Sequence, residues 1–268
     1  MPYRLLATDL DGTLFGHDLV VSPRTRAALD ALRARGCALA LVTGRMYRAT
    51  LPIAQSLGVD TPLVTYQGAW IQSPAAPAPL WHRPLPLAIA REAIAALEAT
   101  GMHLNVYVDD RLYLRRLTEA AASYTALARI EPEVVGDWET ALSGAPTKLV
   151  AIGDEAEVLR QLDVLKARFG AQLFITQSQP TFLEIAHPEV NKGAALARLA
   201  AHLGVAREEV VAVGDGLNDA EMIAYAGLGV AMGDARPGLK AIADRVTKPL
   251  AEDGVAVLIE ELIAEGAI

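Results

Sequence analysis

Residues 5–13 read LLATDLDGT, a short apolar run followed by two aspartates that one leucine separates, and then Gly-Thr. The run from Tyr3 to Thr8 is typical of a strand. Residues two apart in an extended chain point the same way, so we expect the carboxylates of Asp9 and Asp11 to face one spot. Two neighbouring carboxylates repel each other unless a cation or a shared proton relieves them. The stretch therefore predicts a strand that ends at a charged site, with a plain Asp-Gly turn as the alternative.

Helix-like and strand-like segments alternate on the C-terminal side of this stretch. A capping Ser22 with Pro23 at the first helical position predicts a helix that ends at Gly36. The same alternation returns near the end of the chain. The pattern predicts an α/β fold with a doubly wound, parallel, Rossmann-like sheet. The predicted strands are Tyr3–Thr8, Ala38–Val42, Pro62–Thr65, Val210–Val213 and Leu228–Ala231, and the predicted helices are Arg45–Leu57, Lys192–Leu203, Ala220–Tyr225 and Gly254–Ala264.

The middle of the chain has a different character. Residues 73–86 are rich in proline and alanine, which marks a boundary. Beyond it, alternation around Asp109-Asp110 predicts a hairpin, and further helix and strand patterns follow. We therefore expect an inserted α/β domain, with residues 1–81 and 188–268 forming a core in two parts and residues 82–187 forming the insert.

Composition excludes several classes of protein. The 268 residues are 52% hydrophobic and 21% charged, which is enough apolar material for a core and argues against disorder. A net charge of −8 without a basic run disfavours nucleic acid and anionic membrane surfaces as partners. The single cysteine, Cys37, allows no internal disulfide. No apolar run approaches the length of about 20 residues that a membrane helix needs, so we expect a soluble, cytoplasmic protein.

Three further polar motifs lie at predicted strand or helix ends. Thr43-Gly44-Arg45 offers a hydroxyl, a glycine amide and a helix N-terminus, which together can hold an anion. Asn191-Lys192-Gly193 opens a helix, and Lys192 can bring a point charge to a phosphate. Residues 214–219, GDGLND, carry Asp215 and Asp219, whose oxygens suit a hard cation. Each motif alone is a weak signal.

Other phosphate and nucleotide folds match poorly. The sequence Gly227-Leu228-Gly229 lacks the third glycine of a dinucleotide fingerprint, because Met232 stands there. No Gly-Lys pair is present for a P-loop, and Cys37 begins a predicted buried strand rather than a phosphate loop. The five histidines show no metal-ligand spacing.

Taken in order, DxDGT, TGR, NKG and GDxxND resemble the haloacid dehalogenase-like superfamily, and within it the Cof-like subgroup of phosphohydrolases. The resemblance covers essentially the whole chain, and the insert lies where that subgroup carries its α/β cap. It implies a Mg²⁺-dependent phosphatase that hydrolyses a small phosphorylated metabolite of the sugar phosphate class through an aspartyl-phosphate intermediate. A phosphomutase or phosphotransferase of the same superfamily, or a non-catalytic module that binds Mg²⁺ and phosphate, are the alternatives.

The resemblance also implies roles for residues that match the motifs. Asp9 is then the nucleophile and Asp11 the general acid and base. The remaining roles concern the metal and the phosphate. Asp9, the backbone carbonyl of Asp11, and Asp215 would hold Mg²⁺; the Leu10 amide, Thr43, Gly44, Lys192 and Asn218 would hold the phosphoryl oxygens; and Asp219 would orient Lys192 or the metal shell.

The chain departs from the subgroup pattern at three places. Gln67 stands where asparagine is usual, Asp234 stands after Ala-Met-Gly where asparagine is usual, and Pro249-Leu250 replaces a small residue and asparagine. None of these positions belongs to the implied catalytic set. Gln67 and Asp234 do change the residues expected on the substrate side.

A charge count shows why a metal is expected. With Mg²⁺ and Lys192 present, the four aspartates of the implied site leave one net negative charge. At 4 Å and an effective dielectric constant near 20, one unit charge repels another by about 4 kcal/mol. Protonation of Asp11 removes that charge and supplies the proton that a leaving alcohol needs. The metal is therefore predicted to be obligatory, and an all-oxygen site favours Mg²⁺.

Overall fold

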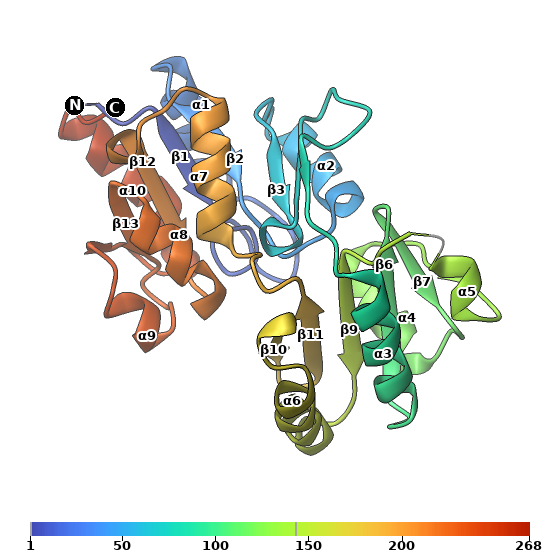
Figure 1. The fold of residues 1–268 in the computed structure, drawn as a ribbon. Helices are drawn as coiled ribbons and strands as arrows, with labels where there is room; N and C mark the ends of the chain where they lie inside the picture. The colour runs from blue at the N-terminus through green and yellow to red at the C-terminus, as the bar shows by residue number, and fades with distance from the viewer. Residues whose placement is uncertain (1, 143) are drawn as a thin grey trace. The chain divides into compact units, whose positions relative to one another are not determined.

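The computed structural model describes residues 2–142 and 144–268, and the chain divides into two compact units. One unit combines the N-terminal residues up to Trp81 with Asn191–Ile268, and the other is His82–Val190. Each unit has its own sheet and its own helices (Figure 1).

The first unit is built on a five-stranded parallel sheet in the order β14-β13-β12-β1-β2. Its central strands are buried along their whole length and apolar except for Thr8, as expected for strands that are covered on both faces. The predicted doubly wound parallel sheet is therefore confirmed. The strands are β1 Leu5–Thr8, β2 Ala38–Leu41, β12 Val210–Gly214, β13 Leu228–Ala231 and β14 Arg245–Val246.

Helices cover both faces of this sheet. Helix α1 packs against α10, and α7 packs against α8; right-handed crossovers place these two pairs on opposite faces (Figure 1). Ser22 caps α1 by accepting a hydrogen bond from the Thr25 N–H at 3.0 Å. The helices are α1 Pro23–Ala34, α2 Tyr47–Ser56, α7 Lys192–His202, α8 Ala220–Tyr225, α9 Pro237–Lys240 and α10 Gly254–Ala264.

The third predicted strand, Pro62–Thr65, was expected in the parallel sheet, but its main pairing is antiparallel. Strand β3 (Leu63–Thr65) pairs antiparallel with β4 (Trp70–Gln72), and β5 (Trp81–His82) follows β4 in the same small sheet. A single parallel bridge, from Val42 to Val64, links β3 to the strand before it. The reason is the tight turn Tyr66–Gly68, which sends the chain straight back on itself.

The second unit carries a six-stranded sheet in the order β10-β11-β9-β6-β7-β8. The hairpin predicted at Asp109-Asp110 is confirmed, and both residues adopt positive φ, as this kind of tight turn requires. One face of the sheet packs on α3 and α6 through an apolar cluster that includes Val106, Leu149 and Leu183. The elements are α3 Leu87–Glu98, β6 His103–Val108, β7 Arg111–Leu114, α4 Glu119–Ala128, β8 Glu133–Val134, α5 Trp138–Ala141, β9 Lys148–Ile152, α6 Glu155–Phe169, β10 Phe174–Gln179 and β11 Phe182–Ala186.

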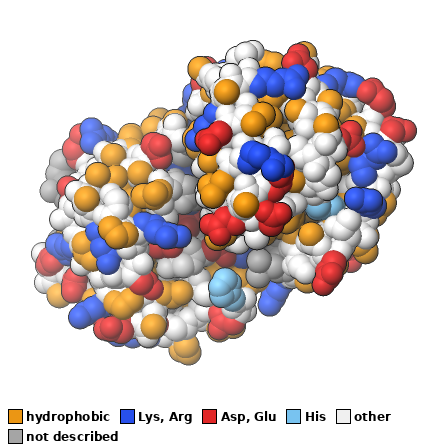
Figure 2. Space-filling view, turned by 90° about the horizontal axis from the view of Figure 1, so that it is seen from below, with side chains coloured by type: hydrophobic (Ala, Val, Ile, Leu, Met, Phe, Trp, Pro, Cys, Tyr) orange, Lys and Arg blue, Asp and Glu red, His pale blue; other side chains and the backbone are white. Residues whose placement is uncertain are grey.

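The distribution of charged side chains, the position of the single cysteine and the hydropathy of the helices agree with what the composition indicates. On the face shown in Figure 2, basic side chains are spread among acidic and apolar ones and do not form one patch. Cys37 is buried and free, which confirms the prediction of a core cysteine. Among the described residues, no helix combines the length and the hydropathy needed to cross a membrane.

Candidate active site

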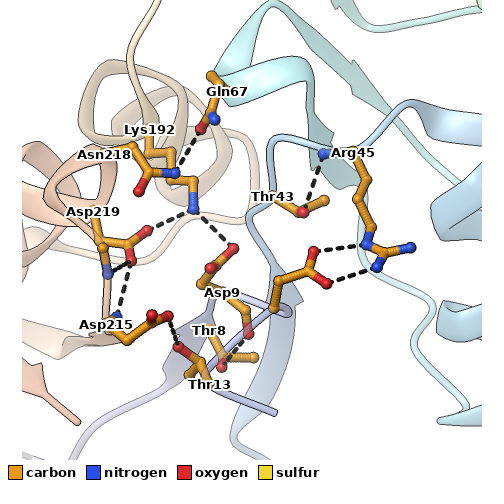
Figure 3. A network of polar contacts seen from close by, with 12 residues as sticks. Thr8, Asp9, Thr13, Thr43, Arg45, Gln67, Lys192, Asp215, Asn218 and Asp219 are labelled. Carbon is orange, nitrogen blue, oxygen red and sulfur yellow. Dashed lines mark hydrogen bonds and ion pairs between the residues drawn. The ribbon is translucent and has the colours of Figure 1, made fainter. Parts of the chain in front are cut away.

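The carboxyl ends of parallel strands share one edge of the first unit's sheet, and the polar motifs meet there. Asp9 follows β1, Thr43 follows β2 and Asp215 follows β12. Figure 3 shows the side chains that converge at this edge. Ligands of open α/β sheets bind at such an edge.

Lys192 lies at the centre of the site with no exposed surface. Its Nζ donates to Asp9 Oδ1 at 2.8 Å and to Asp219 Oδ1 at 2.5 Å (Figure 3). Asn191 fixes the start of α7, because its side chain accepts a hydrogen bond from the Ala194 N–H. Burial of an ammonium group is tolerated only with such partners. The predicted helix start at Lys192 is confirmed. Its contact with Asp219 agrees with one of the two roles expected for that aspartate, whereas its contact with Asp9 was not predicted.

The pKa values of these groups depart from their ordinary values. Burial raises the pKa of Asp9 from 3.8 to about 7; Lys192 opposes this rise, and the charges of Asp219 and Asp215 add to it. Burial also raises the pKa of Asp215 to about 6. Burial alone would lower the pKa of Lys192, but the charges and hydrogen bonds of Asp219 and Asp9 outweigh it and raise that pKa. The cluster holds more negative charge than Lys192 neutralises.

Asp9, Asp215 and Asp219 can direct one carboxylate oxygen each toward a common point, with these oxygens within 4.8 Å of one another. The oxygens of Asp219 are already engaged, since Oδ1 meets Lys192 and Oδ2 accepts from the backbone N–H groups of Asp215 and Gly216. Asp9 and Asp215 keep oxygens that are open to a cation. An all-carboxylate donor set with excess negative charge fits Mg²⁺.

Thr13 is a residue of this site that the sequence reasoning missed. Its hydroxyl donates to Asp215 Oδ1 at 2.9 Å and so orients a carboxylate that can hold the metal. Gly12, at φ +83°, lies against the same carboxylate, and a Cβ there would come within 2.5 Å of Asp215 Oδ2. The Gly-Thr pair after the second aspartate is visible in the sequence, but the pattern predicts only a turn there.

The extended-chain argument that Asp9 and Asp11 face one spot does not hold. Strand β1 ends at Thr8, so the alternation of an extended chain does not reach Asp11. Asp11 instead receives two hydrogen bonds from Arg45, Nε to Oδ2 at 2.7 Å and Nη2 to Oδ1 at 2.6 Å. Arg45 was visible in the TGR motif, but a contact across 34 residues leaves no signal in the spacing.

The groups expected to bind phosphate lie beside this cluster. Thr43 is buried, and its Oγ1 accepts a hydrogen bond from the Arg45 N–H at 3.2 Å. In the part of the chain that the structure describes, the Leu10 backbone N–H has no protein acceptor. Asn218 is exposed, and its Nδ2 donates to Gln67 Oε1 at 3.1 Å. Gln67 lies directly over Gly44, where any Cβ would collide with its amide.

Comparison with known proteins places the chain among phosphatases. The sequence profile of the haloacid dehalogenase-like hydrolase family matches residues 6–259. The chain is 33% identical over 261 residues to a 5-amino-6-(5-phospho-D-ribitylamino)uracil phosphatase of Bacillus subtilis, covering 97% of this chain and 96% of that protein. It is 33% identical over 244 residues to an HMP-PP phosphatase of Serratia proteamaculans, covering 90% and 87%.

The fold comparison agrees. The crystal structure of a haloacid dehalogenase-like hydrolase from Bacteroides thetaiotaomicron superimposes with a TM-score of 0.90 at 28% identity, covering 97% of this chain and 99% of that one. The likeness therefore extends over both units of the chain, including the inserted one.

Proposed function

This chain belongs to the haloacid dehalogenase-like hydrolase family and is a phosphoric monoester hydrolase, and on that premise we propose a Mg²⁺-dependent hydrolysis of a small phosphorylated metabolite. The observation that carries the proposal is the buried Lys192, which donates hydrogen bonds to Asp9 and Asp219 at the carboxyl edge of the sheet. It supports Asp9 as a nucleophile with a cation on one side and a metal position on the other.

In the proposed reaction, an Asp9 carboxylate oxygen attacks phosphorus. The bond between phosphorus and the ester oxygen breaks, and the leaving oxygen takes a proton from Asp11. Water then attacks the phosphorus of the aspartyl phosphate, Asp11 accepts a proton from that water, and the bond to Asp9 breaks to release inorganic phosphate. Atoms and charges balance over the two steps, and both use the same acid and base.

The positive groups of the site counter the charge of the phosphoryl group. Asp9, the Asp11 carbonyl and Asp215 would hold Mg²⁺, which supplies Lewis acid stabilisation of phosphoryl oxygens when bound. Lys192, the Leu10 amide, Thr43, Gly44 and Asn218 would contact the phosphoryl oxygens. Asp219 keeps Lys192 in place, because its Oδ1 is one of the two acceptors of the ammonium group.

Asp11 needs a change of partner for this role. In the structure its carboxylate is bound by Arg45. An incoming phosphate dianion also attracts the Arg45 guanidinium, and that attraction would free Asp11 to meet the leaving oxygen. The acid and base function is therefore proposed for the phosphate-bound enzyme.

The substrate class rests on the relatives. The two phosphatases compared above act, by their names, on HMP-PP and on 5-amino-6-(5-phospho-D-ribitylamino)uracil, both small phosphorylated metabolites. We propose a substrate of that kind, of the sugar phosphate class. The unit His82–Val190, which has its own sheet, would serve as the cap that excludes water and selects the leaving group.

The test is hydrolysis of a panel of phosphorylated metabolites with Mg²⁺, with EDTA, and by Asp9→Asn. Release of inorganic phosphate that stops with EDTA and falls by several orders of magnitude in Asp9→Asn is expected, since an amide cannot act as the nucleophile. Activity of Asp9→Asn within tenfold of wild type contradicts the proposal. Phosphate transferred to a second metabolite, without release, favours the phosphotransferase alternative.

A further inference from the structure

The turn between β3 and β4 is strained. Tyr66 and Gln67 adopt left-handed conformations, with φ of 53° and 59°, and Gly68 follows at 103°. For a residue with a Cβ, the left-handed region costs about 1–2 kcal/mol. Two such residues in succession persist only where surrounding contacts fix them.

The contacts that fix the turn come from the phosphate side of the site. The Tyr66 N–H donates to the Arg45 carbonyl at 2.9 Å, and the Gln67 N–H donates to the Thr43 carbonyl at 3.0 Å. Gly68 lies so close to the start of α7 that a Cβ would come within 2.6 Å of the Asn191 carbonyl oxygen. The turn thus joins the Thr43–Arg45 loop to the helix that carries Lys192.

The Gln67 side chain extends this connection to a third loop. Its Oε1 accepts a hydrogen bond from Asn218 Nδ2, and its Nε2 lies over the Gly44 backbone. Among the described residues, this Nε2 has no protein acceptor, although the side chain is half-buried. Figure 3 shows Gln67 above Asn218 at the top of the network.

We propose that Gln67 is a phosphate-binding residue, whose Oε1 holds Asn218 and whose Nε2 donates to a phosphoryl oxygen beside Gly44. This rests on the proposed function of the site. A neutral donor strengthens phosphate binding without disturbing the balance among the aspartates.

Two variants separate a donor from a scaffold. Gln67→Met keeps the length and the backbone strain but loses both polar atoms. Gln67→Glu keeps an acceptor for Asn218 and replaces the N–H donor with a carboxylate oxygen. Gln55→Met, on the exposed face of α2, is the matched control. The probe is inorganic phosphate with Mg²⁺, measured by calorimetry and as a competitive inhibitor of p-nitrophenyl phosphate hydrolysis.

We expect Gln67→Met to bind phosphate about 10-fold more weakly than wild type, which is the effect of one hydrogen bond to a charged group. Gln67→Glu should be weaker still, because its carboxylate repels the phosphate. KM should rise in both variants while kcat changes little, since the contact exists before and during the reaction. Gln55→Met should match wild type, and melting temperatures show that each variant is folded.

The order of affinities decides the matter. A Gln67→Glu protein that binds phosphate as tightly as wild type overturns the proposal, because neither the lost donor nor the added negative charge would then be felt by the phosphate. Phosphate affinities within about twofold of wild type in both Gln67 variants overturn it as well. If wild type, Gln67→Met and Gln67→Glu bind phosphate with decreasing affinity in that order but wild type hydrolyses no substrate, the function proposed above fails and the role of Gln67 stands. A wild-type chain that binds no phosphate contradicts both.

Discussion

Arg45 and Asp11 form a two-pronged ion pair, in which Nε and Nη2 of the guanidinium each donate to one oxygen of the carboxylate, at 2.7 and 2.6 Å. The Arg45 side chain is 14% exposed and its guanidinium lies over the Phe15 ring, whereas Asp11 is 51% exposed. The arginine is therefore the fixed partner and the aspartate the movable one. The pair sets the position from which the proposed acid starts.

Arg45→Lys should lower kcat/KM for a sugar phosphate by about 10- to 100-fold. Lysine keeps the charge but cannot make two parallel hydrogen bonds to one carboxylate, so Asp11 no longer starts from the position that the ion pair gives it. The loss should be smaller for p-nitrophenyl phosphate, whose leaving group hardly needs a proton. Steady-state kinetics on both substrates measure the difference. Arg207→Lys is the control, because Arg207 precedes the amino end of β12 and the site lies at the carboxyl end. Equal losses on the two substrates would mean that Arg45 acts on phosphate directly and not through Asp11.

Asp11→Asn should phosphorylate Asp9 faster with p-nitrophenyl phosphate than with a sugar phosphate, and then stall. General acid assistance is typically worth 10²–10⁴-fold, and a sugar alcohol needs it far more than a nitrophenolate does. The same residue should activate the attacking water, so the second step slows for every substrate. Rapid mixing should show a burst of nitrophenolate of up to one per site, followed by slow turnover and a labile phosphoprotein.

Two results would remove Asp11 from the acid and base role. One is an equal loss on both substrates, and the other is the absence of any burst or trapped phosphoprotein. The second of these would also weaken the covalent route itself. Asp9→Asn serves as the control, since it can form no aspartyl phosphate and should show neither burst nor label.

Much of the fold follows from sequence because its strands are apolar and its turns carry strong local signals. Ala38–Leu41 and Val210–Gly214 are short, fully apolar segments between helices, and Asp109-Asp110 lies at the centre of an alternating hairpin. The place of β3 could not be predicted in this way. Its pairing depends on a turn in which Tyr66 and Gln67 adopt backbone conformations that their side chains disfavour, and tertiary contacts alone hold them.

In the site, too, the features with a local sequence signal are predictable, and those that depend on tertiary contacts are not. Motif spacing brings Asp9, Lys192 and Asp219 to one edge of the sheet, and the structure joins them by hydrogen bonds. The partners of Asp11 and Asn218 were not predicted, because Arg45 and Gln67 reach them across 34 and 151 residues through the fold. The contacts of long flexible side chains leave no periodic pattern in a sequence, so only the three-dimensional structure reveals them.

Thr13→Val should weaken Mg²⁺ binding by about tenfold and leave the fold intact. Valine has nearly the shape of threonine but cannot donate to Asp215 Oδ1, and loss of a group that orients a metal ligand typically costs 10–100-fold in metal affinity or activity. Titration of activity with Mg²⁺ measures the shift, and saturating metal should restore most of kcat. Thr13→Ser keeps the hydroxyl and should bind Mg²⁺ like wild type. A Thr13→Val protein with unchanged metal dependence would exclude Asp215 as a ligand that Thr13 orients.

The last prediction concerns how stability depends on pH and metal. The pKa of Asp9 lies at about 7 in the folded chain against an ordinary value of 3.8, so the folded state binds a proton that the unfolded chain has already released. Between about pH 4 and about pH 7 the folded state therefore holds more protons, and the free energy of unfolding falls as the pH rises.

In EDTA, the melting temperature should thus decrease from about pH 5 to about pH 8, and Asp215, with its pKa raised to about 6, adds to the slope. Mg²⁺ binds the deprotonated carboxylates, so the stabilisation it gives should be larger at about pH 8 than at about pH 5. Asp9→Asn removes the main titrating group and should show a flatter pH profile in EDTA together with weaker stabilisation by Mg²⁺. Thermal melts of the two proteins across this pH range, with and without metal, measure all three effects. A wild-type profile that rises with pH in EDTA, or a Mg²⁺ effect that does not grow with pH, would show that Asp9 and Asp215 are not the carboxylates that the metal neutralises.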